Sequence, residues 1–329
     1  MGIMKNKKTT LTHNKHNNNK KKKKYKVRNW KEYNEALVQR GSINIWIDKK
    51  AMNKWYAEPT HKQGSPLTYS DLAIETALTV RKLFNLPLRS LEGFLISIFK
   101  QANVYLDVPD FSTYCRRGKN IKVYLNKSKK EKTQIIVDSS GVKVYGEGEW
   151  KVRKHGYSKH RTWKKIHIAI DEKGEIRAVD TTGNNSHDSE IAKSLLDQED
   201  AKIEKFIGDG GYDTRSVYDL SDEKNISEVI VPPQKNAKIW QHGNSKKKPF
   251  ARDENLRQIR KKSRKNWKIE SDYHIRSLSE NSFFRFKTII GDRLRSRNQS
   301  SQKTEVMIAF NILNKMFSLG MPDSYAVTV

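Results

Sequence analysis

Two short apolar segments each run directly into an aspartate, and this pattern constrains the fold more than any other feature of the sequence. The segment TQIIVD ends at Asp138, and the segment KFIGD ends at Asp209, where Gly210 and Gly211 allow a tight turn. Such short apolar runs are typical of buried strands. If the two strands are neighbours in one sheet, their aspartates lie side by side at its edge.

A strand-terminal aspartate has two interpretations. One is a turn former, which is the commoner role for a single residue of this kind. The other is a metal ligand, because two adjacent carboxylates repel each other unless a cation lies between them. Oxygen ligands without a Cys or His cluster would favour Mg²⁺ or Mn²⁺. The pair alone leaves both interpretations open, and a third ligand is needed to decide.

The segments around these acids alternate between strand and helix patterns. A hairpin turn at residues 172–174 joins the second and third strands, Ser186 is expected to cap the next helix, and a basic insertion follows at about 235–265. This order predicts an α/β fold with a mixed five-stranded sheet and flanking helices. The strands are expected at residues 133–140, 165–171, 175–183, 205–209 and 228–231.

A long helix expected from about Trp267 carries the third acid. Tyr273, Arg276, Glu280 and Lys287 would share an arc of roughly 60° on a continuous α-helix. That face fits either a solvated row of ion pairs or a carboxylate–metal site flanked by phosphate contacts. The opposite, apolar side of the helix would pack on the sheet, and it consists of Ile275, Leu278, Phe286 and Ile289.

The part of the chain before the sheet is predicted to be helical. Residues 70–84 and 90–101 show apolar stripes at helical spacing, and the first begins at a capping Ser70. A shorter polar segment that contains Arg116 and Arg117 follows. Three such helices fit a helix-turn-helix-like DNA-binding region, and they fit equally a structural three-helix bundle.

The chain therefore divides into four expected parts. Residues 1–24 are a basic, disordered tail, because their composition cannot form a core. Residues 25–130 are the helical region, residues 131–320 the domain with the sheet, and residues 321–329 a C-terminal tail without a readable pattern.

Charge points to a polyanionic partner. The net charge is +28, and residues 1–28 contribute 11 of these charges, so the remaining chain is also strongly basic. Nucleic acid is the leading candidate, although codon bias also explains a Lys/Asn-rich tail. The single cysteine, Cys115, rules out a disulfide framework and fits a reducing cytoplasm. The longest apolar run, 93–99, is too short to span a bilayer.

Several longer motifs resemble one family, the bacterial DDE transposases of insertion-sequence family five. The resemblance rests on the segment from VDSSGVKVYGEGEWK to KKIHIAID, on GDGGYDTR and VIVPPQ, and on the pattern Y-(2)-R-(3)-E-(6)-K. It covers about residues 27–322 and decides the question about Asp138. The resemblance implies an RNase H-like catalytic domain in which the catalytic and metal-binding triad is Asp138, Asp209 and Glu280.

The same resemblance implies the cofactor and the partners. Two Mg²⁺ (or Mn²⁺) ions are expected at the triad, and Tyr273, Arg276 and Lys287 match positions that contact the DNA backbone. The expected partners are the terminal inverted repeats, target DNA and a second copy of the chain, in the bacterial cytoplasm at the nucleoid. Neither a membrane nor a small-molecule substrate is expected.

Some features keep two interpretations at this point. His187 and Asp188 match a recurrent HD pair, and helix capping explains them equally well. Trp240 fits stacking on an unpaired base or ordinary packing. Two other functions share parts of the pattern: a DNA-binding repressor without catalysis, and an RNase H-like nuclease that does not act on element ends.

Overall fold

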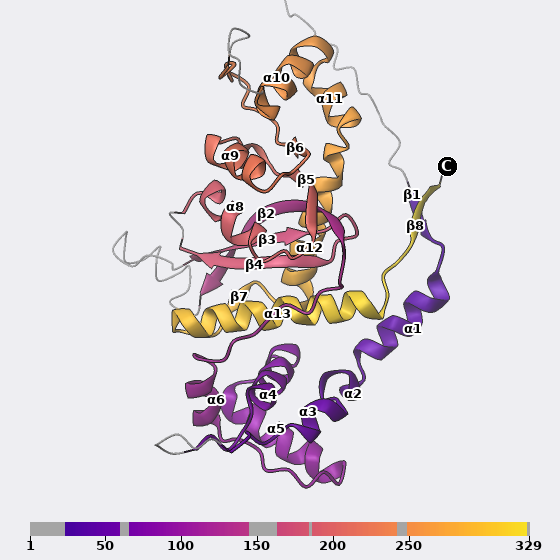
Figure 1. The fold of residues 1–329 in the computed structure, drawn as a ribbon. Coiled ribbons are helices and arrows are strands. Elements are labelled where there is room, and N and C mark those ends of the chain that lie inside the picture. Colours follow the sequence, from indigo (N-terminus) through magenta and orange to yellow (C-terminus); the bar gives the residue numbers. More distant parts are fainter. Residues whose placement is uncertain (1–23, 60–65, 145–162, 184–185, 242–248, 328–329) are drawn as a thin grey trace, which may run out of the picture.

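The computed structural model describes residues 24–59, 66–144, 163–183, 186–241 and 249–327. The predicted disordered tail therefore lies outside the described residues except for Lys24. Figure 1 shows two bodies stacked on one long helix, α13 (Gln299–Leu319): a group of N-terminal helices on one side and a sheet with its helices on the other.

The N-terminal region is helical, as predicted. Its two longest amphipathic helices bury Ile74 and Leu91 among other apolar residues, and the Ser70 hydroxyl accepts a hydrogen bond from Ala73 N at 3.0 Å, which confirms the expected cap. The helices are α1 (Trp30–Arg40), α2 (Ile43–Trp46), α3 (Lys49–Asn53), α4 (Asp71–Leu83), α5 (Leu88–Gln101) and α6 (Phe111–Arg117).

The sheet contains the five predicted strands in the order β4-β3-β2-β5-β6, and a short sixth strand, β7, pairs with β2. β2 is antiparallel to β3 and parallel to β5 and β7, so the sheet is mixed and consistent with the RNase H-like expectation. The strands are β2 (Lys132–Val144), β3 (Trp163–Ile170), β4 (Ile176–Thr182), β5 (Lys202–Ile207), β6 (Glu228–Ile230) and β7 (Arg293–Leu294).

The prediction that the first strand stops near Asp138 is wrong, because β2 continues for six residues beyond it. Its pairing with β5 ends at Ile136, opposite Ile207, whereas its pairing with β3 continues to Lys143. Asp138 is therefore open to one side because the neighbouring strand ends, although its own strand does not.

Each face of the sheet packs on different helices. Val137 faces a core formed with α8 (Asp188–Leu196) and α9 (Arg215–Glu223), whereas Ile136 faces a core formed with α12 (Ser277–Arg285) and α13. This second core also contains Trp55 and Leu91, so one continuous apolar cluster joins the N-terminal helices to the sheet through α13.

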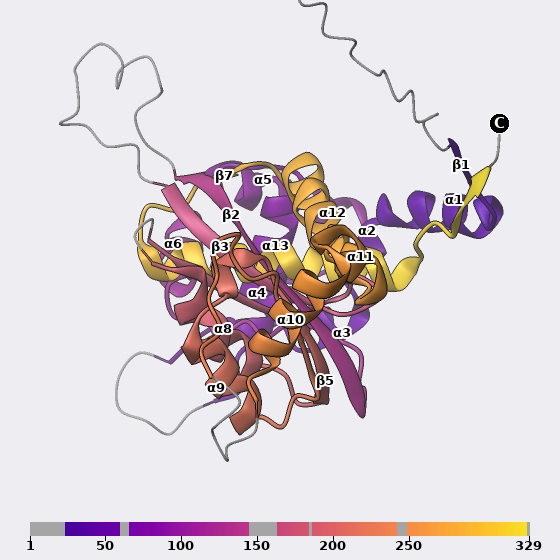
Figure 2. The same ribbon diagram turned by 90° about the horizontal axis from the view of Figure 1, so that it is seen from above.

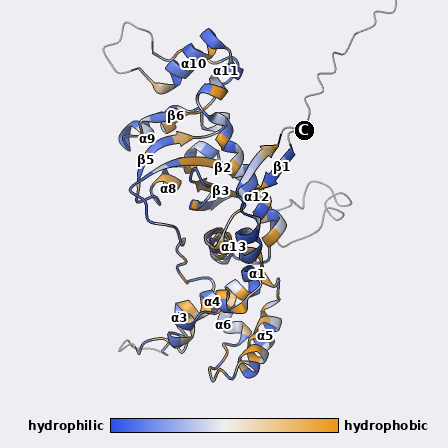
Figure 3. Cartoon of the chain, turned by 90° about the vertical axis from the view of Figure 1, so that its right-hand side faces the viewer, coloured by the Kyte–Doolittle hydropathy of each residue, from blue (hydrophilic) through white to orange (hydrophobic). Residues whose placement is uncertain are grey.

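Two local predictions on these elements were wrong. His187, not Ser186, occupies the N-cap of α8, and its side chain makes no capping hydrogen bond. The basic insertion, for which no element was predicted, contains α10 (Ala251–Lys262) and the start of α11 (Arg264–Glu270), at a hydrophilic end of the molecule in Figure 3. Ile289, expected on the packed side of a helix, is 42% exposed.

The C-terminal residues, which showed no pattern in the sequence, form a strand. β8 (Ser324–Val327) pairs antiparallel with β1 (Lys24–Val27), so the two ends of the described chain meet. Figure 2 shows this ribbon and α1 extending away from the rest of the molecule. Within the described ranges, no helix is long and apolar enough to cross a membrane.

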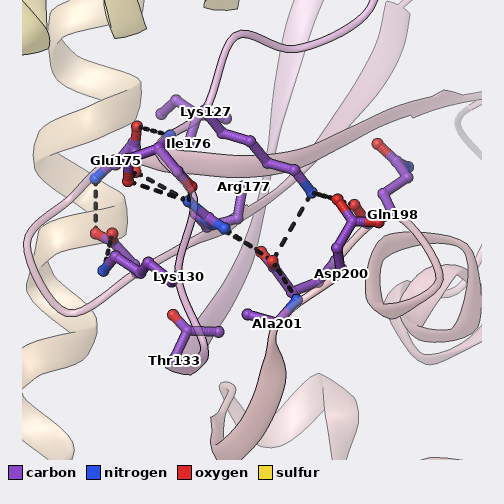
Figure 4. A network of polar contacts seen from close by, with 12 residues as sticks. Lys127, Lys130, Thr133, Glu175, Ile176, Arg177, Gln198, Asp200 and Ala201 are labelled. Carbon is purple, nitrogen blue, oxygen red and sulfur yellow. Dashed lines mark hydrogen bonds and ion pairs between the residues drawn. The ribbon is translucent and has the colours of Figure 1, made fainter.

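A buried network of charged side chains fixes the edge of the sheet where β2 and β5 begin (Figure 4). Arg177, only 2% exposed, donates from Nε to Glu199 at 2.6 Å and from Nη1 to Glu175 at 3.0 Å. Nearby, Lys130 Nζ lies 2.6 Å from Asp171 Oδ2. These pairs fasten the segment that enters β2 to the hairpin between β3 and β4.

Candidate active site

Asp138 and Asp209 meet at the opposite edge of the sheet, where β5 ends. Ile136 pairs with Ile207 in the parallel β2/β5 ladder, and each aspartate follows two residues later. Asp209 has left the strand: it begins the 3₁₀ turn Gly210–Tyr212, and its Oδ1 accepts a hydrogen bond from Gly211 N at 2.8 Å. The register of two parallel strands therefore brings the two carboxylates to one place.

Three groups fix the Asp138 carboxylate. Its Oδ2 accepts from the Ser279 hydroxyl at 2.7 Å and from Arg276 Nη1 at 3.0 Å, and its Oδ1 accepts from Ser139 N at 2.9 Å. Ser279 is fully buried, so α12 is held firmly against β2 at this point. Sequence reasoning did not find Ser279, because a serine one residue before Glu280 carries no distinctive signal.

The segment with the third acid is not one regular helix, contrary to the prediction. Residues Tyr273–Arg276 form a 3₁₀ turn, α12 follows, and Phe286–Ile290 form a π-helical turn. The predicted neighbours still meet, because Arg276 donates from Nη2 to Glu280 Oε1 while its Nη1 reaches Asp138. Arg276 thus bridges two of the three acids.

The two ends of this segment lie near the same edge of β2. Lys287 Nζ donates to the Ser140 hydroxyl at 2.7 Å, two residues beyond Asp138. At the other end, the field of Asp209 and Asp138 adds to burial in raising the pKa of Tyr273, although Arg276 opposes the shift. Tyr273, Arg276, Glu280 and Lys287 therefore all lie around the edge that holds the two aspartates.

The pKa shifts confirm that the acids share one electrostatic environment. Burial lowers the pKa of Arg276, but Asp138, Glu280 and Asp209 together raise it above its ordinary value. Burial and the charges of Asp188, Asp209 and Asp138 raise the pKa of Tyr212 well above its ordinary value. Arg276 thus contacts two of the expected catalytic acids and lies in the electrostatic field of the third, Asp209.

Asp188 is a fourth acid at this edge, and its surroundings clarify the HD pair. Its Oδ1 lies 2.7 Å from Lys165 Nζ and 3.3 Å from Nδ1 of the fully buried His167, whose Nε2 is 2.8 Å from the Thr182 hydroxyl. Burial raises the pKa of Asp188, but its contacts with His167, Lys165 and Ser139 lower it to about 2. Asp188 thereby ties the start of α8 to β3 and to the residue after Asp138.

The remaining sequence candidates lie elsewhere. Arg117 donates to Tyr69 O at 2.8 Å and pairs with Asp71, so its side chain is engaged within the chain, whereas Arg116 is exposed. Trp240 is half-buried and lies under Arg252, whose guanidinium carbon is 3.9 Å from the ring centroid. Tyr218 and Phe250 pack edge-on against the same ring, which is the packing alternative for this tryptophan.

The donor set suits a divalent cation of the kind that the resemblance implies. Carboxylate oxygens are the preferred ligands of Mg²⁺ and Mn²⁺, and Arg276 already supplies the positive charge that such acids need between them. Among the residues that the structure describes, however, no three His, Cys, Asp or Glu side chains lie close enough to hold an ion as they stand. In this arrangement the guanidinium of Arg276 lies between Asp138 and Glu280.

Comparison with known families gives an independent result. A family model described as a transposase DDE domain matches residues 129–315, more than half of the chain, and a second model with the same description matches residues 38–147. No solved structure matches the chain. The longer match spans the segments that carry Asp138, Asp209, Arg276 and Glu280. The chain belongs to the family of DDE transposases.

Proposed function

We propose that this transposase cuts DNA at the terminal inverted repeats of an insertion sequence and joins the freed ends to target DNA. The observation that carries the proposal is the bridge that Arg276 makes between Asp138 and Glu280, at the edge of the sheet where Asp209 follows the neighbouring strand. These acids come from a strand, a turn and a helix, and we assign them as the catalytic, metal-binding triad.

The chain's own contacts suggest how the triad is prepared for two Mg²⁺ or Mn²⁺ ions. When bound, such ions activate the attacking water or DNA 3′-hydroxyl and stabilise the leaving oxygen of an in-line displacement. Asp138 and Asp209 are each held by a backbone N–H donor, from Ser139 and Gly211. Glu280, with its side chain 59% exposed, is free to reorient toward them.

Arg276 has two roles in this proposal. Without DNA, it offsets the repulsion among the acids. When metal and DNA bind, it exchanges the carboxylates for a backbone phosphate, for which the flat guanidinium is well suited. Tyr273 and Lys287 flank the same edge and would contact neighbouring phosphates, with Lys287 already beside Ser140 on β2.

The N-terminal helices would recognise the repeats. In this proposal α6 and its exposed Arg116 lie against DNA, and a second chain brings the other end of the element into a paired complex. The helix-turn-helix-like reading stays a prediction. The direct way to separate it from a purely structural bundle is to compare repeat binding of the Arg116→Gln variant with that of the unchanged chain.

Cleavage of linear DNA that carries the element's own terminal repeat, with Mg²⁺ or Mn²⁺, tests the proposal. We expect metal-dependent nicking at the repeat boundary. Asp138→Asn, Asp209→Asn and Glu280→Gln should each reduce it by about a thousandfold, because the metal site supplies several kcal/mol of transition-state stabilisation. DNA binding should survive in all three variants.

A matched control removes a nearby carboxylate outside the site. Asp272 begins the 3₁₀ turn of Tyr273 but its side chain makes no capping hydrogen bond, so Asp272→Asn should cleave normally. Repeat binding without cleavage by the unchanged chain would favour the repressor. Cleavage regardless of the repeat would favour the nuclease.

A further inference from the structure

A pocket of about 540 Å³ lies between the N-terminal helices and the start of α13, and nothing described so far uses it. Its walls come from α4, the start of α5, α6, the turn after α6, and the segment between β7 and α13. The lining is strongly basic. Six of its residues are cationic: Arg81, Lys82, Arg89, Lys119, Arg295 and Arg297.

The only carboxylate in the lining is already neutralised. Glu305 accepts from Lys82 Nζ at 2.8 Å and from the backbone N–H groups of Arg295 and Ser296 at 3.1 and 2.9 Å. Among the residues that the structure describes, no ion pair joins Arg81, Arg89, Lys119 or Arg295 to an acidic side chain. Burial and the nearby charge of Arg295 lower the pKa of Arg81, although Glu305 opposes them, so the two guanidinium groups repel each other. A bound anion would relieve that repulsion.

Two further features of the wall suit an anion: a buried hydroxyl group without a partner and a helix N-terminus. Tyr114 is 1% exposed, and its hydroxyl has no hydrogen-bond partner among the described residues. Asn298 caps α13, a helix of 21 residues, so the partial positive charge of that helix end also faces the pocket. Arginine, lysine, a hydroxyl group and a helix N-terminus together are a typical set of ligands for phosphate.

The pocket is connected to the active site through the sheet. Val144, at the end of β2, pairs with Leu294, and Arg295 follows immediately. Val144 is six residues beyond Asp138, which is about 20 Å along a strand. One DNA strand covers this distance in roughly six nucleotides. A DNA strand of about this length would therefore span the separation between Asp138 and the start of the pocket wall at Arg295.

We propose that this pocket binds a backbone phosphate of the DNA whose end lies in the active site, and so acts as a second anchor for the substrate. The inference rests on the proposed function for the identity of the ligand. Because the contact is with phosphate, it adds affinity without sequence preference.

The salt dependence of DNA binding tests the anchor in the full chain, without divalent metal. Lys119→Gln with Arg295→Gln removes two pocket cations, and Lys100→Gln with Lys122→Gln removes two exposed cations outside it. The pocket variant should lower the slope of log K against log salt by about 1, because one phosphate contact is lost, equally on repeat and unrelated duplexes. The control pair should leave the slope unchanged, and an equal change in both pairs would overturn the proposal.

If the double variant fails to fold, the exposed Lys119→Gln alone should lower the slope in the same direction, by less than about 1. A second measurement uses the unchanged protein. Cys115 lines the pocket, is exposed and is the chain's single cysteine, so a maleimide reagent reports on this place alone. Duplex DNA should slow its alkylation about tenfold or more, whereas inorganic phosphate at the same phosphate concentration should not. Equal protection by inorganic phosphate would assign the pocket to a free anion and overturn the DNA assignment.

Failure of the anchor and failure of the proposed function give different results. The anchor alone is wrong if the chain cleaves element ends, DNA does not protect Cys115, and the salt dependence of DNA binding does not change when the pocket cations are removed. If DNA protects Cys115 and the slope falls as expected but no cleavage occurs with either metal, the catalytic proposal alone is wrong.

Discussion

Two charge clusters, each built around one arginine, lie at opposite edges of the same sheet. Around Arg177, where β2 and β5 begin, the partner Glu199 has a side chain only 1% exposed. Around Arg276, where β5 ends, the side chain of the partner Glu280 is 59% exposed. The buried cluster has no room to exchange partners, so it is structural. The open cluster is accessible, so its acids can release Arg276 and bind a ligand in its place, as a catalytic site requires.

The largest effect is expected from opening the buried cluster. Arg177→Met leaves Glu199 and Glu175 buried without their partner, and should lower the free energy of unfolding by about 3–5 kcal/mol. Urea unfolding followed by circular dichroism measures it. Lys262→Met, which breaks an exposed pair with Glu270, is the control and should cost less than about 1 kcal/mol. Equal costs would contradict the assignment of the Arg177 cluster as structural.

The open cluster should respond in activity instead. Under the proposed function, Arg276→Ala removes a charge that would contact a DNA phosphate, so it should reduce cleavage roughly a hundredfold, with less than about 1 kcal/mol lost from the free energy of unfolding. Because Arg276 competes for the acids, the same variant should bind Mn²⁺ more tightly without DNA, measured by calorimetry. Lys265→Ala, an exposed cation on α11, should change neither quantity. Weaker Mn²⁺ binding would show that Arg276 does not compete with the ion.

Changing Asp188 should affect both stability and cleavage. Its carboxylate is paired inside the protein like those around Arg177, but it lies beside the Arg276 cluster. Asp188→Asn weakens the contacts to Lys165 and His167 and should lower the free energy of unfolding by about 2 kcal/mol. Cleavage should fall as well at a temperature where the variant is fully folded, because the neighbour of Asp138 loses a partner. Glu190→Gln, exposed on the same helix, is the control. Unchanged cleavage would limit Asp188 to a structural role.

The smallest expected effect is a pH dependence of the free energy of unfolding, and it comes from the buried cluster around Arg177. Burial raises the pKa of Glu199, but hydrogen bonds from Arg177 and Ala201 hold it below the ordinary 4.5. The folded-state pKa is depressed, so this stabilisation is present above about pH 4.5 and is lost as the pH falls below it. Glu199 therefore contributes at most about 1.4 kcal/mol per pH unit to the change of the free energy of unfolding with pH. Glu199→Gln should remove this pH dependence of the free energy of unfolding, whereas Glu204→Gln, at an exposed residue, should keep it. Equal pH slopes in the unchanged chain and both variants would contradict the assignment to Glu199.

The sequence determined the elements and their chemistry. Alternation and capping are local, so the five strands of the sheet and the cap at Ser70 could be predicted without the fold. The side-by-side placement of Asp138 and Asp209 followed from two strand patterns that end in acids. The spacing of the long motif identified Arg276 and Glu280, even though the helix that carries them is irregular.

Tertiary structure decided everything that depends on distant segments. The two-residue strand β7 and the β1/β8 ribbon are too short to show a period, and they exist because a partner strand far away in the sequence supplies their hydrogen bonds. The role of Asp188 depends on Lys165 and His167 from β3. Likewise, Arg81, Lys119 and Arg295 form one pocket only because α13 packs against the N-terminal helices. Local patterns name the residues that can carry charge, and long-range packing decides which of those charges are compensated and which remain open for a ligand.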